Sequence, residues 1–319
     1  MKQNNKLRYL SIIINILLIC LIIYKLKYFE NINNFENENE NENKNENENE
    51  NENGKIAFLF LTYSNLKRPD IWNRFFDDKN SNKFTIYNHA KENEKVTNLI
   101  LKDKHIPEHI ETCWGCPNLV EANLLMMKQA LRNKKNKKFI LVSDSCIPIV
   151  SFNIFYNEIM KDNKTKINIY ENNKLENYDL DRYDTINEPP FKKNEFIKHS
   201  GSGLVFNLKH TQMLVSNLDT FIKNWKNAYI PDEHYFGSIL RVLDTNFNIN
   251  YENYNITFDI WSKNKLTETN LNDTDIITDG YLNINKITNK AIDEIRDKKF
   301  LLIRKVDGHT EIDVEHLLI

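Results

Sequence analysis

Apolar residues from position 55 onward form short, nearly continuous runs, which is the pattern of strands buried on both faces. The first run is Lys55–Thr62 (KIAFLFLT), and Tyr63-Ser64-Asn65 ends it. Runs at Phe84–Tyr87 and Phe139–Val142 predict two further strands, the latter followed by Ser143-Asp144-Ser145-Cys146. A polar loop directly after an apolar run is expected where a buried parallel strand ends at a ligand site.

The stretch between the second and third runs predicts a helix. Asn118 is its predicted N-cap, the helix continues to about Arg132, and Glu121 at the third position completes a capping box. Strands alternating with helices predict an α/β domain with a mostly parallel central sheet. Ligands of such sheets bind at the C-terminal ends of the strands, so we expect Thr62, Ser64 and Asp144 on one rim of a cleft.

The N-terminal part has a different pattern. Leu10 to Tyr24 is almost entirely apolar, which predicts a membrane contact through residues 9–27, and basic residues before it favour a cytoplasmic N-terminus. A signal peptide is the competing interpretation, although no small-residue cleavage site follows. Residues 30–53 are nearly all Asn and Glu and cannot form a core.

This pattern divides the chain into three parts. Residues 1–28 are predicted to be a cytoplasmic tail and a single signal-anchor transmembrane helix, residues 29–54 a disordered stem, and residues 55–319 a globular domain. The predicted protein is therefore a single-pass type II membrane protein whose domain lies in the lumen of the Golgi or another secretory compartment.

The composition fits a folded domain, with 319 residues of which 40% are hydrophobic and 28% charged. The net charge of -2 gives no reason to expect a nucleic-acid partner. Four cysteines form no disulfide framework. Cys113 and Cys116 have the spacing of a zinc or redox site but lack a second ligand pair, which favours a disulfide or two free thiols.

The most informative polar cluster is Pro231-Asp232-Glu233-His234-Tyr235-Phe236. One interpretation is structural: Pro231 and Asp232 open a helix that runs from Glu233 to Leu243, with acids placed well against its dipole. The other interpretation is chemical, because a carboxylate in a cleft is a candidate general base for a substrate hydroxyl. The residues of the cluster alone do not decide between the two.

Seven segments together carry a family resemblance. They are KIAFLFLTYSNL, FTIYNHA, WGCPNLVEANLLMMKQAL, FILVSDSCIPIVSFNIFYNEI, HSGSGLVFNLKH, WKNAYIPDEHYFGSIL and FLLIRK, in this order from residue 55 to residue 305. In these segments the chain resembles the core-2/I-branching β-1,6-N-acetylglucosaminyltransferases, including the plant branch and the related protein xylosyltransferases. The resemblance implies a GT-A type nucleotide-sugar fold and inverting transfer from a UDP-sugar to a glycan or glycoprotein hydroxyl, with N-acetylglucosamine as the expected sugar.

The resemblance also implies roles for individual residues. Glu233 stands where the family has its catalytic base, so Asp232 is expected to cap a helix or orient its neighbour. Arg304 and Lys305 match the basic motif that binds the leaving diphosphate, whereas Lys286 matches a second basic residue weakly. Solvent-exposed residues at a strand end are the alternative for Arg304 and Lys305.

Because the similar enzymes work without a metal, neither a metal site nor a cofactor is expected. The possible metal motifs, which are Asp179-Leu-Asp181, Asp273-Thr-Asp275 and Asp144, are interpreted as chance occurrences.

Further substrate contacts are implied in the cleft. Ser200-Gly201-Ser202 matches the family's turn beside the sugar, where a residue without Cβ lets the backbone approach a ligand. An ordinary tight turn before a strand at Leu204–Asn207 is the alternative. Trp261 lies near the family's acceptor-binding aromatic residues, or it is a core tryptophan.

Two rival functions remain: a metal-dependent GT-A transferase of other donor specificity, and an inert glycan-binding membrane protein.

Overall fold

A computed structural model describes residues 54–170, 177–259, 271, 275–278 and 283–318. Residues 54–319 form one compact unit. The predicted membrane segment at 9–27, the predicted stem and Trp261 lie outside the described residues. In the part of the chain that the structure covers, every helix is too short or too polar to cross a membrane.

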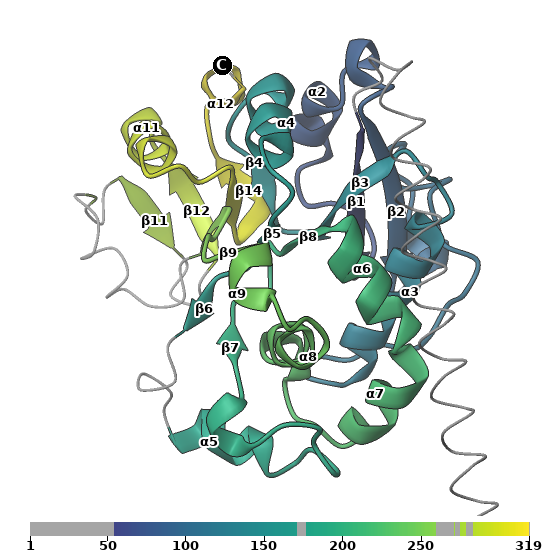
Figure 1. The fold of residues 1–319 in the computed structure, drawn as a ribbon. Helices are drawn as coiled ribbons and strands as arrows, with labels where there is room; N and C mark the ends of the chain where they lie inside the picture. Colours follow the sequence, from purple (N-terminus) through teal and green to yellow (C-terminus); the bar gives the residue numbers. More distant parts are fainter. Residues whose placement is uncertain (1–53, 171–176, 260–270, 272–274, 279–282, 319) are drawn as a thin grey trace, which may run out of the picture. The chain divides into compact units, whose positions relative to one another are not determined.

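The central sheet has the strand order β2-β1-β3-β8-β5-β9 (Figure 1). Strands β2, β1 and β3 are mutually parallel, β8 runs antiparallel to β3 and β5, and β9 is parallel to β5. The prediction of a mixed α/β fold with a largely parallel central sheet is therefore confirmed. The six strands are β1 (Lys55–Thr62), β2 (Phe84–Ala90), β3 (Asn136–Ser143), β5 (Thr165–Lys166), β8 (Val205–Asn207) and β9 (Tyr251–Glu252).

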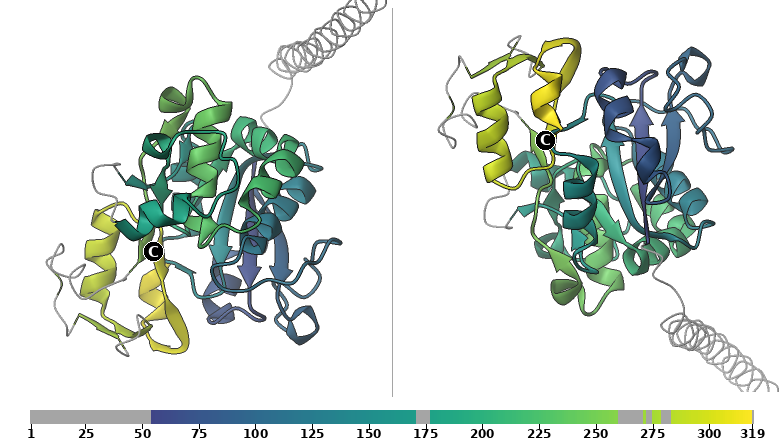
Figure 2. Two further views of the ribbon diagram at one scale, coloured as in Figure 1. Left: turned by 90° about the horizontal axis from the view of Figure 1, so that it is seen from below. Right: turned by 90° about the horizontal axis from the view of Figure 1, so that it is seen from above.

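Both faces of this sheet are covered by helices (Figure 2). Successive residues of a strand point to opposite faces, so Leu59 belongs to one apolar cluster and Phe58 to the other. The Leu59 side is packed by α3 (Asn118–Ala130), α6 (Leu208–Ser216) and α8 (Tyr235–Leu243), and the Phe58 side by α2 (Pro69–Phe75) and α4 (Phe152–Met160). This double burial explains why β1 and β3 read as continuous apolar runs.

A smaller C-terminal layer carries the basic motif. Its strands form the orders β10-β13-β4 and β11-β12-β14. A third apolar cluster, which includes Ile292 and Ile303, joins these strands to helix α11. The elements are β4 (Ile147–Pro148), β10 (Thr257–Asp259), β11 (Ile276–Thr278), β12 (Ile284–Ile287), β13 (Leu302–Arg304), β14 (Val306–Glu311) and α11 (Asn289–Asp297).

The remaining elements are short. They are α5 (Asn177–Tyr183), α7 (Leu218–Trp225), α9 (Phe247–Asn250), α12 (Val314–Leu317), β6 (Ile169–Tyr170), β7 (Lys198–His199) and the 3-10 turns η1 (Asp78–Asn80), η2 (Asn93–Lys95), η4 (Lys193–Glu195) and η5 (Pro231–Glu233).

Two local predictions were wrong. Helix α3 begins at Asn118 itself, after Pro117, and the Asn118 amide donates to the Glu111 carbonyl at 2.9 Å instead of capping the helix. The predicted helix from Glu233 to Leu243 is divided into turn η5 and helix α8, because His234 between them has a non-helical φ of -136°. The Asn118 side chain thus bonds to the loop that precedes α3, and the His234 ring bonds to the Ile197 carbonyl of a distant segment.

Candidate functional site

Glu233 lies at the end of turn η5, where an arginine that the sequence did not single out contacts it. Arg182 of α5 donates through Nη1 to Oε2 of Glu233 at 2.7 Å, and the Glu233 side chain is 24% exposed. Ile230, just before the turn, has φ of 50°, a left-handed conformation that is rare for a β-branched residue. Such strain persists only where the surroundings enforce it, and it is frequent at functional sites.

Buried polar groups fix Arg182 in turn. The same Nη1 lies 3.1 Å from Nε2 of His234, whose Nδ1 faces the Ile197 carbonyl at 3.0 Å. Since that carbonyl only accepts, Nδ1 carries the proton and Nε2 accepts from Arg182. Burial, reinforced by nearby His199, lowers the pKa of His234 to about 2, so the ring stays neutral.

Asp179 provides a counter-charge on the other side of Arg182. Its carboxylate lies 2.9 Å from the Lys198 ammonium and 3.6 Å from Arg182. Asp179 belongs to one of the Asp-x-Asp triplets, and its ion pairs are those of a structural residue. Asp275, of the other triplet, pairs with Lys290 at 2.8 Å. Within the described ranges, no three His, Cys, Asp or Glu side chains are grouped to hold a metal ion.

Asp232 and the Ser-Gly-Ser turn lie directly against each other. A Cβ placed on Gly201 would be 3.3 Å from Oδ2 of Asp232 and 3.5 Å from Cγ of Glu233. Oδ1 of Asp232 is buried without a hydrogen-bond partner. Burial, with repulsion from Glu233, raises the pKa of Asp232 to about 6. Asp232 therefore does not cap α8, and Gly201 allows the turn to approach the two acids.

The raised pKa of Asp232 should make the stability of the folded protein depend on pH. Between the ordinary carboxyl pKa of about 3.9 and about 6, the unfolded chain releases a proton that folded Asp232 retains, so rising pH lowers the free energy of unfolding. We expect Asp232→Asn to raise the melting temperature at pH 8 and to leave it nearly unchanged at about pH 3, where the carboxyl is protonated in both the folded and the unfolded chain. An equal shift at both pH values would contradict the raised pKa.

The Ser200–Ser202 turn connects the acids to the basic motif. Ser200 Oγ donates to the Ser202 carbonyl at 2.8 Å, and Ser202 Oγ donates to Oδ2 of Asp259 at 3.3 Å. Asp259 and Arg304 are partners in the parallel β10–β13 ladder. The Arg304 charge also lowers the pKa of Asp232, against the larger effect of burial. Arg304 is thus near the acids, and Asp259 is a site residue that the sequence analysis missed.

Lys305 connects Arg304 to the predicted rim of the central sheet. Burial, and then the charge of Arg304, lower the Lys305 pKa, whereas Asp259 and Asp144 act in the opposite direction. Asp144 accepts through Oδ2 from the Tyr63 amide at 3.1 Å, and Thr62 Oγ1 donates to the Ser64 carbonyl at 3.0 Å. The loops after β1 and β3 therefore lie side by side, as the parallel sheet requires.

Lys286 is placed differently. Its ammonium is 2.6 Å from Oε1 of Glu311 on the neighbouring strand β14, in a surface ion pair. Among the described residues, none of the contacts of Lys286 joins it to Glu233 or Arg304. The diphosphate role of Lys286 stays a prediction.

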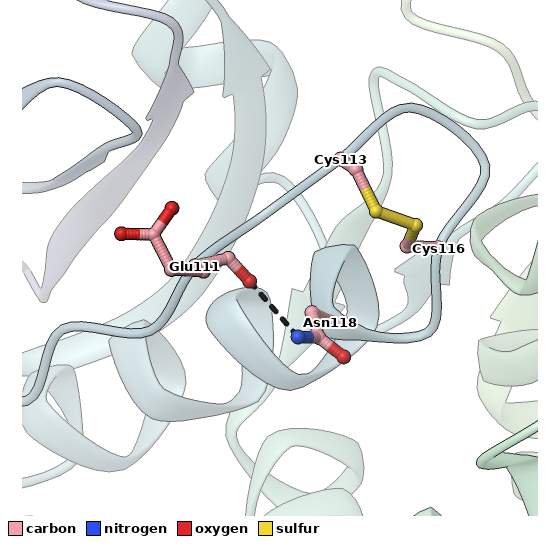
Figure 3. Close-up of a disulfide and its surroundings, with 4 residues drawn as sticks. All are labelled: Glu111, Cys113, Cys116 and Asn118. Carbon is pink, nitrogen blue, oxygen red and sulfur yellow. Dashed lines mark hydrogen bonds between the residues drawn. A yellow bond between two sulfur atoms is a disulfide. The ribbon is translucent and has the colours of Figure 1, made fainter.

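Of the two alternatives for Cys113 and Cys116, a disulfide or two free thiols, the structure has the disulfide. Cys113 and Cys116 form a disulfide in the loop before α3 (Figure 3), and Cys146 is free and buried. Gly115, between the two bonded cysteines, has φ of 71°, which glycine adopts without strain. Its carbonyl accepts from the Ile230 amide at 2.9 Å, so the disulfide loop contacts the segment that leads into Glu233.

Comparison with known proteins identifies the family of the chain. The family described as Core-2/I-Branching enzyme matches residues 56–295. The chain is similar to Glycosyltransferase BC10 of Oryza sativa subsp. japonica, with 24% identity over 216 residues, 58% of this chain and 53% of the relative. The chain thus spans about half the length of that curated relative.

The comparison with solved structures gives a weaker likeness. The crystal structure of A197 from STIV matches 50% of this chain and 67% of its own, at 8% identity and a TM-score of 0.25. The family match includes most of β1, the Ser200–Ser202 turn and Glu233, and it ends within α11, before Arg304 and Lys305. This chain belongs to the Core-2/I-Branching enzyme family.

Proposed function

We propose that the protein is an inverting glycosyltransferase with a GT-A type fold that moves a sugar, N-acetylglucosamine in the first instance, from a UDP-sugar to a hydroxyl of a glycan or glycoprotein. The observation that carries the proposal is the placement of the Glu233 carboxylate across the Ser200–Ser202 turn from Arg304 and Lys305. A base and a cationic site for an anionic leaving group are the two parts that this reaction needs. The name of the rice relative, a glycosyltransferase, supports the same reaction class.

In the proposed reaction, Glu233 takes the proton of the acceptor hydroxyl as its oxygen attacks the anomeric carbon. The new carbon–oxygen bond forms on the face opposite the UDP, so the configuration inverts. The bond to the diphosphate oxygen breaks with its electron pair, and UDP leaves as an anion. Arg304 and Lys305 are oriented cations that stabilise this charge as it develops.

Arg182 is a positioning residue in this scheme. It occupies Oε2 of Glu233 at 2.7 Å, and Oε1 has no hydrogen-bond partner among the described residues. Since Arg182 occupies Oε2, Oε1 is the oxygen that takes the proton of the acceptor hydroxyl in this scheme. Because His234 and Asp179 hold the guanidinium from behind, the carboxylate keeps one orientation before the acceptor arrives.

The proposed location is the lumenal face of a secretory membrane, with residues 9–27 as the type II anchor. The Cys113–Cys116 disulfide supports an oxidising compartment, because thiols are kept reduced in the cytosol. The apolar run of the N-terminal segment supports the anchor.

A transfer assay with and without a chelator tests whether the proposed reaction needs a metal ion. We expect the purified full-length chain to transfer sugar from a UDP-sugar at the same rate with EDTA as with manganese, because the basic residues perform the role of a cation. UDP-N-acetylglucosamine, UDP-xylose and UDP-glucuronic acid are the donors to compare, and NMR of the product reports the anomeric configuration. Loss of transfer on chelation, restored by manganese, would favour a metal-dependent transferase.

A further inference from the structure

A hollow on the protein surface adjoins Glu233 on the Arg182 side. Its lining comprises Asp181, Arg182, Thr185 and Tyr229, and its volume is about 280 Å³. Arg182 both lines this hollow and contacts Oε2 of Glu233. Whatever fills the hollow is therefore separated from the proposed base by one guanidinium group.

Tyr229, which lines the hollow, packs against a second exposed aromatic ring, that of Trp114. Trp114 is 76% exposed and Tyr229 is 52% exposed, and their ring centroids are 6.3 Å apart at an interplanar angle of 75°. An indole exposed to this degree costs free energy in water and gains it when a ligand covers the ring. The Trp114 and Tyr229 rings form what we call the aromatic corner.

The backbone fixes the aromatic corner. The Cys113–Cys116 disulfide closes the loop that carries Trp114, and the Ile230 amide donates to the Gly115 carbonyl at 2.9 Å. The Tyr229 amide donates to Oγ1 of Thr185 at 3.2 Å. A ligand that binds these rings therefore meets a preformed surface and orders little of the chain on binding.

The chemistry of the hollow fits a pyranose ring. Sugars present an apolar face of C–H groups, which packs on an indole or phenol ring, and an edge of hydroxyls. Asp181 accepts from such hydroxyls and Arg182 donates to them. Small-molecule sites combine apolar surface with a few convergent polar groups, and the volume of about 280 Å³ is at the lower end of their range of about 300–1,000 Å³.

We propose that the hollow and the aromatic corner form an acceptor subsite, which holds a sugar ring adjacent to the one whose hydroxyl reacts at Glu233. The inference rests on the proposed glycosyltransferase function and extends it to the acceptor. It gives the Cys113–Cys116 disulfide a role, since the disulfide holds Trp114 against Tyr229. It predicts a preference for acceptors of at least two sugars.

The test compares Trp114→Ala with Trp114→Phe in the full-length chain, using a disaccharide and a monosaccharide acceptor. We expect Trp114→Ala to raise the KM for the disaccharide roughly tenfold, with kcat and the KM for the donor nearly unchanged, because one stacking contact is lost. Trp114→Phe keeps a ring and should retain most of the affinity. Ile249→Ala, which removes an apolar side chain 70% exposed elsewhere, is the matched control.

A second arm does not depend on turnover. Saturation-transfer NMR should detect disaccharide binding to the full-length chain without donor, and Trp114→Ala should weaken that binding roughly tenfold while UDP still binds. The subsite is overturned if Trp114→Ala matches the wild type in disaccharide binding and in its KM for the disaccharide. If the wild type binds the disaccharide but turns over no UDP-sugar, the proposed function fails and the sugar site stands. If it neither binds the disaccharide nor discriminates it from the monosaccharide, the subsite fails.

Discussion

Glu233→Gln is expected to lower kcat by about 10²–10⁴-fold, the usual contribution of a general base, while UDP binding stays at the wild-type level. Glutamine has the shape of glutamate, and its carbonyl oxygen can still accept from Arg182, which lies 2.7 Å from Oε2 in the wild type. The substitution therefore removes the negative charge and the proton acceptor with little change in geometry. Calorimetry with UDP and initial rates with saturating acceptor measure the two quantities separately.

Two further variants make this result specific to the base. Glu233→Asp retains a carboxylate but withdraws it by one methylene, so an intermediate rate is expected. Glu108→Gln removes a carboxylate from a surface ion pair with Lys128 on α3 and should leave the rate unchanged. Wild-type turnover by Glu233→Gln would sink the assignment.

Asp232 is the rival base that the structure brings into view. Its pKa, raised to about 6 mainly by burial, lies closer to the working pH than an ordinary carboxyl. Its position argues against it, since Oδ2 faces Gly201 and Oδ1 is buried, whereas Glu233 is 24% exposed. Asp232→Asn should therefore keep most of the activity, and a loss as large as that of Glu233→Gln would transfer the role of base to Asp232.

The parts of the fold that the sequence predicts are those with continuous apolar runs. Strands β1 and β3 are read correctly because both of their faces are buried, which leaves no polar alternation to confuse the pattern. The rim of Thr62, Ser64 and Asp144 follows from the parallel sheet alone. The division of the predicted helix at His234 does not follow, because its cause is the bond from the His234 ring to Ile197 in a distant segment.

The residues of the candidate site also differ in whether the sequence points to them. Glu233, Arg304 and the Ser200–Ser202 turn were found because motifs carry them, whereas Arg182 was missed. Arg182 lies 51 residues before Glu233 in a segment with no apolar periodicity, and an arginine among exposed polar residues has no local signal. The sequence signal that could have found it is its spacing of three residues from Asp179, which allows an ion pair on one helix face.

The Ser-Gly-Ser turn is followed by a second glycine, and the two glycines have different structural reasons. The left-handed glycine is Gly203, with φ of 69°, and a Cβ there would lie 2.9 Å from Cβ of Thr257 on β10. Gly201 matters for a different reason, because it allows close approach to Asp232 and Glu233. The sequence identifies the turn, but only the tertiary packing distinguishes the two glycines.

Lys305→Ala is expected to lower kcat by about 10²–10³-fold, the usual effect of removing one group that stabilises developing charge. The wild-type ammonium acts together with Arg304, the residue before it, in the C-terminal layer. Lys128→Ala removes a lysine from an exposed ion pair with Glu108 and is the matched control. Lys286→Ala, measured in parallel, tests the third predicted diphosphate contact.

The pH dependence gives this prediction a second readout. Burial, with the adjacent Arg304 charge, lowers the Lys305 pKa, so the ammonium loses its proton below the ordinary lysine value of about 10.4. Because the charged form is the active one, kcat should fall as pH rises through that lowered pKa. Lys305→Arg keeps its charge at every accessible pH, so its alkaline decline should vanish even if its maximum rate is lower.

The choice of leaving group separates a role in catalysis from a role in folding. A glycosyl donor with a nitrophenolate leaving group needs little help from a cation, because the departing charge is delocalised over the ring. If Lys305 stabilises the departing diphosphate, Lys305→Ala should lose far less activity with that donor than with a UDP-sugar. A structural role would lower both rates by the same factor, and an alkaline decline that persists in Lys305→Arg would assign the titration to a different group.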